Sequence, residues 1–426
     1  MVINNGVLTS VSESDVDENG YILIPAEVKI VETGSFASLK NLKCIEFSEG
    51  LEEVNYEAFS ALPNLNKVIF PNSTKIIGSL PIVRVFNLTP NLNDVQLGLN
   101  VPFTKFAFGL DLTLKIIEQR LSAIEQILNN PKLTEEELLY AMSIYDNTII
   151  HNSFLSKNHM PLKNKFDDIS LKLIAALKNK SSNGKEIGHN LIQTMFEQNK
   201  MIPPSLLNYD TYNLYKSLGL LKDFHPIVFG SSSRGACMSE EDNVLTLDIQ
   251  RIEKLFKNKT GESAKSNNEL NIFLLFITRH ETIHLYHRTR NPKSPSIDDK
   301  KMLIMSKLQK IQDGYEKGYP SNHIASHDCF PDEIDADLSA IELLSQTVIQ
   351  KYNYEAFPME AYAEKYEARK TRAYREVGIE NGEDLILAVM NNALASDRLS
   401  QSERSKLEQL MREYKNIYGN NPPQKI

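Results

Sequence analysis

Apolar residues recur at a fixed distance near the start of the chain. Six pairs are separated by 23 residues, namely Val31 and Val54, Phe36 and Phe59, Leu39 and Leu62, Leu42 and Leu65, Ile45 and Val68, and Phe47 and Phe70. A degenerate third copy follows, because PNLNDVQL at 90–97 repeats PNLNKVIF at 63–70 after 27 residues. A fixed period indicates stacked units that bury one face on the next. We place these units at about 28–50, 51–73 and 74–97.

Within the units, alternating apolar residues predict short strands at Cys44–Phe47 and Val68–Phe70. This pattern resembles the leucine-rich repeats of the BspA-like kind, over about residues 20 to 100. Two and a half copies are too few for a free-standing solenoid, so we expect the unit to lean on the rest of the chain. Two roles stay open: the unit caps the neighbouring domain, or it binds a partner.

After about residue 104 the pattern becomes helical. Leu112–Leu128 repeats apolar residues at spacings of three and four, and Thr134–Glu137 (TEEE) is an N-terminal cap signal. Asn243–Ile249 (NVLTLDI) alternates like a strand, and the polar stretch Lys257–Asn268 predicts a mobile loop. An apolar helix follows, and further helices are expected at about 300–316, 331–351, 357–376, 383–394 and 401–417.

These elements predict an α+β protein that is predominantly helical. We expect a leucine-rich-repeat unit at 1–102, a helical region at 103–222 and a third domain at 223–420. In the third domain a small sheet accompanies the apolar helix.

That helix carries the sequence HETIH. His280 and His284 are four residues apart, so their imidazoles leave the same helix face one turn apart. The spacing suits two corners of a tetrahedral zinc site, with one Zn²⁺ per chain. Glu281 is expected beside the metal without binding it, where it can take a proton from zinc-bound water. Apolar residues on several faces predict that the helix is buried.

A catalytic zinc needs a third protein ligand. The metzincin pattern requires a glycine and a third histidine after HExxH, and this sequence has His287 and Arg290 there. Instead, 332–344 reads DEIDADLSAIELL, which resembles the Glu-containing helix of gluzincin peptidases. The resemblance, over roughly residues 225 to 350, implies that Glu333 is the third ligand and that Asp337 orients His280 or His284. Asp335 is the rival ligand.

Zincin peptidases also place an edge strand over the cleft, and the resemblance gives that role to NVLTLDI. A further donor should stabilise the oxyanion. The candidates are Tyr354, Tyr362, Tyr366, Tyr374, Arg372, His323 and His327, and among them we select Tyr374. His287, one turn after His284, is interpreted as a surface residue, with a place in the cleft as the alternative.

Composition narrows these possibilities. The net charge of -8 and the pI of about 5.7 give no support to nucleic-acid binding. Three scattered cysteines indicate neither a disulfide framework nor a cysteine-based zinc site. No apolar run is long enough to span a membrane, and the N-terminus does not resemble a Sec-type signal peptide. We therefore expect a soluble protein that is cytoplasmic or delivered by another route.

The leading hypothesis is a zinc-dependent endopeptidase of gluzincin type acting on a protein substrate, which the repeats would recruit. A repeat module joined to a protease resembles the layout of bacterial effector (virulence) proteins delivered into host cells. Two alternatives stay open. One is a repeat-based binding scaffold with a structural or silent metal site, and the other is a zinc hydrolase of a non-peptide amide. The sequence does not indicate the oligomeric state.

Overall fold

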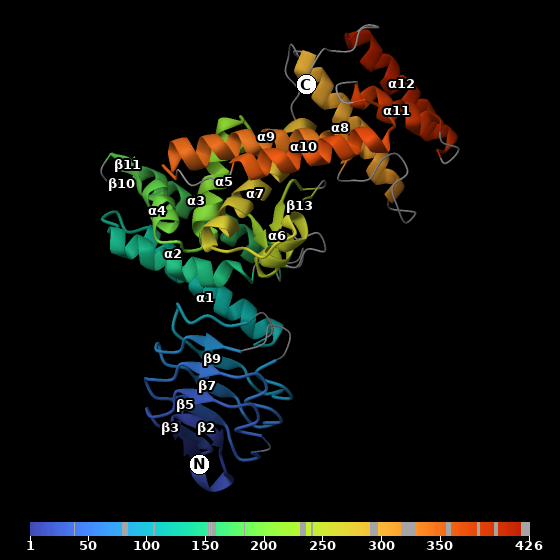
Figure 1. Ribbon diagram of the computed structural model, residues 1–426. Coiled ribbons are helices and arrows are strands. Elements are labelled where there is room, and N and C mark those ends of the chain that lie inside the picture. Colours follow the sequence, from blue (N-terminus) through green and yellow to red (C-terminus); the bar gives the residue numbers. More distant parts are fainter. Residues whose placement is uncertain are drawn as a thin grey trace. The chain divides into compact units, whose positions relative to one another are not determined.

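The structure is a computed structural model of the chain (Figure 1). It describes residues 1–37, 39–78, 84–104, 107–151, 153, 155, 159–182, 184–230, 236–239, 242–289, 297–316, 329–354, 359–380, 384–395 and 399–418. The chain forms two compact units. Unit 1 comprises Met1–Lys180, Pro203–Ser205 and Val228–Gly230, and unit 2 comprises Ser181–Ile202, Leu206–Ile227 and Ser231–Ile426. The division therefore runs through the helical region expected at 103–222.

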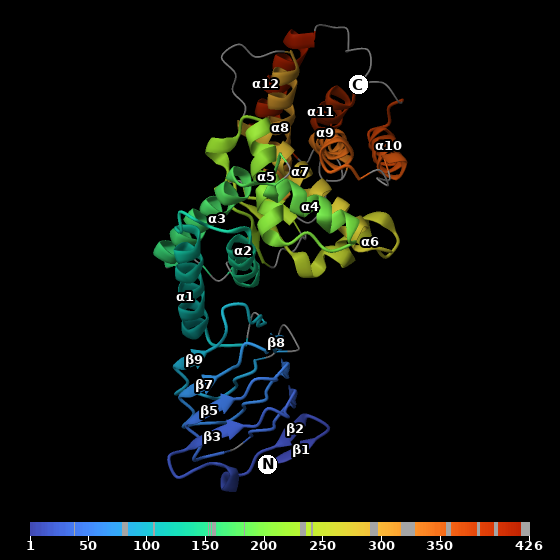
Figure 2. The same cartoon turned by 90° about the vertical axis from the view of Figure 1, so that its left-hand side faces the viewer.

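Unit 1 begins with a stack of repeats in which two narrow β-sheets lie on opposite sides of a shared core (Figure 2). Their strands are β1 (Val2–Asn4), β2 (Val7–Ser10), β3 (Tyr21–Ile24), β4 (Ile30–Val31), β5 (Cys44–Phe47), β6 (Glu53–Val54), β7 (Lys67–Ile69), β8 (Ile76–Ile77) and β9 (Asp94–Gln96). The order is β1-β2-β4-β6-β8 in one sheet and β3-β5-β7-β9 in the other. All neighbours are parallel except β1 and β2, which form an antiparallel hairpin.

The strand register confirms the sequence period. Tyr21 pairs with Cys44, Cys44 with Lys67, and Lys67 with Asp94. Successive repeats, which we call the rungs of the stack, are therefore 23, 23 and 27 residues apart. The rung that contains β2 and β3 precedes residue 28 and was missing from the predicted copies. Its signal is weak because Glu13 and Asn19 occupy the positions that are apolar in later rungs.

Aromatic rings fill the stack between the two sheets. The ring centroids of Phe36 and Phe59 are 5.0 Å apart, and those of Phe59 and Phe86 are 4.7 Å apart. The same apolar cluster continues without a break through Phe108 to Ile116 of helix α1 (Leu110–Leu128). The repeat stack thus leans on the chain that follows it, as expected for so few copies.

Two more helices belong to unit 1, α2 (Glu135–Ile149) and α3 (Met160–Asn179). The predicted cap of α2 is present, because Thr134 Oγ1 accepts the N–H of Glu137 while the Glu137 carboxylate accepts the N–H of Thr134. In α1, the buried Arg120 donates to the carbonyl of Val101, which ties the helix to the end of the stack.

The remaining elements lie in unit 2, except the strand Val228–Phe229 and the first two residues of the helix that begins at Pro204, which belong to unit 1. They are β10 (Ser181–Ser182), β11 (Lys185–Glu186), α4 (Ile187–Glu197), α5 (Pro204–Ser217), β12 (Val228–Phe229), β13 (Ala236–Met238), β14 (Leu245–Leu247), α6 (Ile252–Thr260), α7 (Asn267–Thr289), α8 (Ile297–Glu316), α9 (Pro331–Ser345), a π-helical turn (Gln346–Lys351), α10 (Met359–Glu376), α11 (Leu385–Ala395) and α12 (Gln401–Tyr418). Helices were predicted for each of α7–α12. Helices α9 and α10 lie side by side in both ribbon views (Figures 1 and 2).

The prediction of a mobile loop at Lys257–Asn268 is wrong at both ends of that range. Helix α6 runs to Thr260, and α7 already begins at Asn267. The polar residues at the second boundary are a helix start, since Ser266 Oγ accepts the N–H of Glu269 and the Glu269 carboxylate accepts the N–H of Lys265. Polarity here marks a cap, and the prediction mistook it for disorder.

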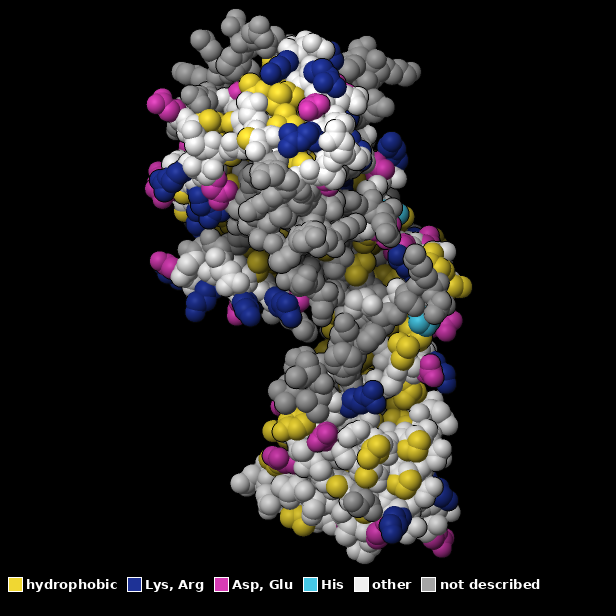
Figure 3. All heavy atoms as spheres, turned by 90° about the vertical axis from the view of Figure 1, so that its right-hand side faces the viewer, with side chains coloured by type: hydrophobic (Ala, Val, Ile, Leu, Met, Phe, Trp, Pro, Cys, Tyr) yellow, Lys and Arg dark blue, Asp and Glu magenta, His cyan; other side chains and the backbone are white. Residues whose placement is uncertain are grey.

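Acidic and basic side chains are scattered among one another over the described residues of the face drawn in Figure 3. Among the helices of the described part of the chain, no segment has the length and apolar character needed to cross a membrane.

Candidate metal centre

The HETIH residues lie on α7, which is buried along most of its length as predicted. Leu274, Leu275 and Ile283 are at most 4% exposed. The start of the helix is held by Asn271, whose side-chain oxygen accepts the N–H of Ile202. The helical spacing places His280 and His284 on one face, and that face is turned toward α9.

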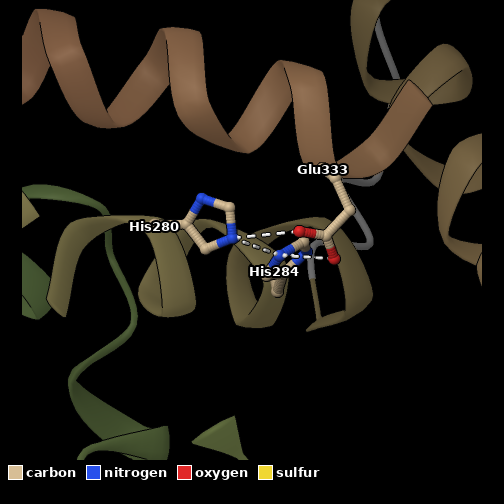
Figure 4. Close-up of side chains that lie close together, drawn as sticks. All are labelled: His280, His284 and Glu333. Atoms are coloured by element: carbon tan, nitrogen blue, oxygen red, sulfur yellow. Dashed lines mark hydrogen bonds and ion pairs between the residues drawn. The ribbon is translucent and has the colours of Figure 1, made fainter. Parts of the chain in front are cut away.

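Helix α9 brings the acidic sequence DEIDADL onto this face. Pro331 occupies its first turn, where the missing N–H has no helical partner to lose. Ala336 and Ala340 are fully buried, and their small side chains permit the close approach of α9 to α7 that the sequence suggested. Glu333 therefore reaches from α9 toward the two imidazoles (Figure 4).

Three side-chain groups converge at this point. The Nε2 atom of His280 lies 3.1 Å from Nε2 of His284 and 3.2 Å from Oε2 of Glu333. His284 Nε2 lies 3.3 Å from Oε1 of Glu333. These residues form a group whose geometry could hold a metal ion. The structure thus brings together all three residues predicted as ligands.

The distances fit a tetrahedral metal ion. Bonds of about 2.0–2.2 Å to nitrogen and oxygen give ligand-to-ligand edges of about 3.3–3.6 Å in a tetrahedron, close to the three distances observed. Each imidazole also faces a carboxylate through its other nitrogen. The Nδ1 atom of His280 lies 2.8 Å from Asp337, and that of His284 lies 2.7 Å from Asp332. A proton held on each Nδ1 leaves both Nε2 lone pairs directed at the centre, as metal ligation requires.

Asp337 lies beside one of the two predicted ligand histidines, His280. The second carboxylate oxygen of Asp337 accepts a hydrogen bond from Arg369 of α10. Arg369 therefore holds the carboxylate from the outer side while His280 contacts it from the inner side. The carboxylate is 11% exposed, so the pair is largely shielded from water.

The corresponding partner of His284 is Asp332, which the sequence analysis did not select. Asp335, considered there as a rival ligand, lies 3.3 Å from Nε2 of His287 and is not in the converging group. The interpretation of His287 as a surface residue is also wrong, because it is 1% exposed and its Nδ1 donates to Asp332 over 2.6 Å. Residues from α9 bury this side chain, and they are more than 40 positions away in the sequence.

The electrostatics of the centre call for a positive charge. Burial alone would lower the pKa of His280, but the carboxylates of Asp337 and Glu333 raise it to about 9. The pKa of His284 is likewise raised against burial by Glu333 and Asp332. Burial would raise the pKa of Glu333, yet the histidines hold it well below its usual range. A metal ion or a proton can supply the charge that these shifts reflect.

Glu281 is fixed by the backbone of a neighbouring strand. Its carboxylate accepts a hydrogen bond of 3.0 Å from the N–H of Met238 in β13. The next N–H along the strand, from Ser239, bonds to Val244 instead. Because successive backbone N–H groups along a strand alternate in direction, the N–H of Met238 points away from β14. The strand whose backbone reaches Glu281 is therefore β13, an outer strand of its sheet, and not the predicted NVLTLDI segment.

Tyr374 does not fit its predicted role as oxyanion donor. It is 6% exposed and belongs to the apolar cluster formed by α8–α12. Tyr366 is a buried member of the same cluster, Tyr354 accepts a hydrogen bond from Asn268, and Arg372 donates to the sulfur of Cys329. Tyr362 packs against Phe276. His323 and His327 lie outside the described residues.

A buried ion pair fixes α7 one residue before His280. Arg279 and Asp210 of α5 are both 1% exposed, and their charged atoms lie 2.9 Å apart. Asp210 also accepts a hydrogen bond from Tyr352. Charges buried this deeply are costly unless paired, so the pair strongly constrains the rotation of α7 about its axis.

Comparison with known proteins identifies only the first part of the chain. Residues 18–127 match the family model described as BspA type leucine rich repeat region (6 copies). The match confirms the resemblance inferred from the 23-residue period and indicates protein–protein interaction. Comparisons with curated proteins and with solved structures gave no significant match.

Proposed function

We propose that the chain is a zinc-dependent peptidase whose metal is held by His280, His284 and Glu333. The convergence of these three groups at tetrahedral distances carries the proposal. Two imidazoles and one carboxylate are a typical catalytic zinc set, and they leave one coordination position for substrate or water. When bound there, zinc supplies a Lewis acid that makes water acidic near neutral pH.

The chain's own residues then divide the work. Asp337 and Asp332 orient the two histidines through Nδ1. Glu281 follows the first ligand, and the Met238 N–H holds its carboxylate in one place. From there it can take the proton of the attacking water and pass it to the leaving amine.

The position of β13 supports a peptide as the substrate. Its outer edge directs a backbone N–H toward the catalytic carboxylate, and an extended chain pairs naturally with an outer strand. The leucine-rich repeats would recruit the protein that carries this peptide. The likeness in layout to bacterial effectors points to a host-cell protein as the target.

The test compares Glu281→Gln with the wild-type chain. Glutamine keeps an oxygen that can accept the Met238 N–H, but it cannot act as a base at neutral pH. We expect both proteins to bind one zinc, measured by elemental analysis, and we expect cleavage of a proteome extract to fall at least about 100-fold in the variant. Glu269→Gln, on the same helix, is the control and should cleave normally.

Equal cleavage by wild type and Glu281→Gln would contradict the peptidase. Zinc binding without any cleavage by the wild type would favour the scaffold with a structural or silent metal. Hydrolysis of small amides without protein cleavage would favour a hydrolase of non-peptide bonds.

A further inference from the structure

His287 is the third histidine on the ligand face of α7, and both of its ring nitrogens face carboxylates. Nδ1 donates to Oδ1 of Asp332 over 2.6 Å, and Nε2 lies 3.3 Å from Oδ2 of Asp335. The side chain is 1% exposed. A histidine in the core without a polar partner would be costly, whereas this one has an acidic partner on each side.

Asp332 connects His287 to the metal centre. Its two oxygens are used separately, since Oδ1 accepts from His287 while Oδ2 accepts from His284 Nδ1 over 2.7 Å. Asp335, His287, Asp332 and His284 therefore form one buried row that ends at a proposed ligand. The first three members of this row do not belong to the converging group.

A carboxylate bound at only one oxygen can still rotate about its Cβ–Cγ bond. Two donors on opposite oxygens fix its plane, and they also fix the direction in which Oδ2 meets His284. Because Asp332 is only 3% exposed, water is poorly placed to replace a missing donor. Removing His287 would leave a buried carboxylate half-satisfied and free to turn.

We propose that His287 is a positioning residue of the metal site. It holds Asp332 so that the Nδ1–H of His284 stays bonded and the Nε2 lone pair of His284 faces the metal. The inference rests on the proposed function for the identity of the metal ion. The competing explanation is that His287 only packs α7 against α9.

Two variants of nearly equal shape separate these explanations. His287→Asn can place an amide N–H where Nδ1 stands, whereas His287→Leu has the same branching and no donor. Zinc affinity is measured on the full chain by competition with a chelator. Outer partners of ligand histidines typically contribute 10–100-fold in affinity. We expect His287→Leu to bind zinc at least about 10-fold more weakly and His287→Asn to stay within about 3-fold of wild type.

A coupling measurement completes the test. In an Asp332→Ala background the Leu and Asn variants should bind zinc equally, because the carboxylate through which His287 acts is gone. Thermal unfolding in the presence of a chelator scores the packing effect separately. If His287→Leu does not fold, His287→Gln replaces it, since its amide lies toward Asp335 and leaves Asp332 without a donor.

Equal zinc affinity of the Leu and Asn variants, whether both are weakened or both unchanged, would overturn the inference. If the wild-type chain binds no zinc, the proposed function fails, and the positioning role is then judged from the imidazole ¹H–¹⁵N spectrum of His284. We expect a hydrogen-bonded Nδ1–H signal from His284 in wild type and His287→Asn and a loss of that signal in His287→Leu. An unchanged spectrum in all three would overturn the inference by itself.

Discussion

The repeat stack and the candidate metal centre are both well buried, but they are held together by opposite means. In the stack, Val54, Phe59 and Val68 are fully buried, and they touch other apolar groups. In the centre, Asp332 and Glu333 are almost as deeply buried among histidines. The first region gains free energy from removing apolar surface from water. The second brings charges together at a cost that their pairing must offset.

The difference separates stability from binding. An apolar stack is complete without a ligand, so damage to it should appear as lost stability. The centre collects three lone-pair donors around one point, and its geometry is complementary to a cation. Damage there should appear first in metal affinity. The predictions that follow test whether the two regions can be perturbed independently.

The largest effect is expected from Phe59→Ala. Phe59 is fully buried and packs against Phe36 and Phe86, so its truncation should cost about 3–5 kcal/mol of unfolding free energy. Denaturant unfolding with hydrogen exchange at β7 measures the loss. Leu23→Ala is the control, since Leu23 is 52% exposed and its truncation should change stability by less than about 0.5 kcal/mol. Weakened zinc binding in Phe59→Ala would show that the regions are coupled.

Next in size is the effect of Glu333→Ala on the metal. The loss of a direct ligand should reduce zinc affinity by more than about 100-fold, beyond the range typical of outer partners. Glu342→Ala, at an exposed position of the same helix, should leave affinity unchanged. Calorimetric titration of both variants makes the comparison. Stoichiometric, tight zinc in Glu333→Ala would mean that the third ligand has been assigned to the wrong residue.

The smallest effect concerns pH. The metal-free chain holds a proton on His280 up to a pKa of about 9. Zinc must displace that proton, and the pKa of His284 is raised as well, so affinity should rise by at least about tenfold per pH unit between pH 7 and 9. Titrations buffered at several pH values measure the slope. A zinc affinity that does not change with pH would contradict the assignment of His280 as a ligand.

The raised pKa of His280 also predicts how the stability of the metal-free protein changes with pH. The folded-state pKa of His280 lies above its value of about 6.5 in an unfolded chain. The stabilisation is therefore complete below pH 6.5 and is lost as the pH rises toward 9. Metal-free protein should melt at a lower temperature at pH 9 than at pH 6.5, and bound zinc should reduce the difference.

The sequence predicted the stack better than the surroundings of the candidate metal centre. A repeat puts equivalent residues in equivalent surroundings, so Leu42 and Leu65 report on each other across one period. The first rung was not predicted because it faces only one neighbouring repeat and tolerates polar residues such as Glu13. The strand registers and the matched family region agree with the rest of the prediction.

In the candidate centre, local spacing was enough to predict that His280, His284 and Glu333 converge, but not which residues surround them. His280 and His284 share a helix turn, and Glu333 and Asp337 share another. The role of Asp332 depends on its contact with His284, 48 residues away in sequence, and the burial of His287 on its contact with Asp332, 45 residues away. A helical period gives no information on contacts between residues so far apart. The same limit applies to Glu281, whose partner is a backbone N–H and has no side-chain signature.

The constant register of the rungs has a consequence for how such a chain can change over generations. Each 23-residue step from Tyr21 through Cys44 to Lys67 repeats one geometry, so a duplicated step would insert in frame and lengthen the stack by about 4.8 Å. Such an event alters the reach and the exposed face of the stack without touching any residue of α7 or α9. The first part of the chain can therefore diversify by copying, while the centre can change only one residue at a time.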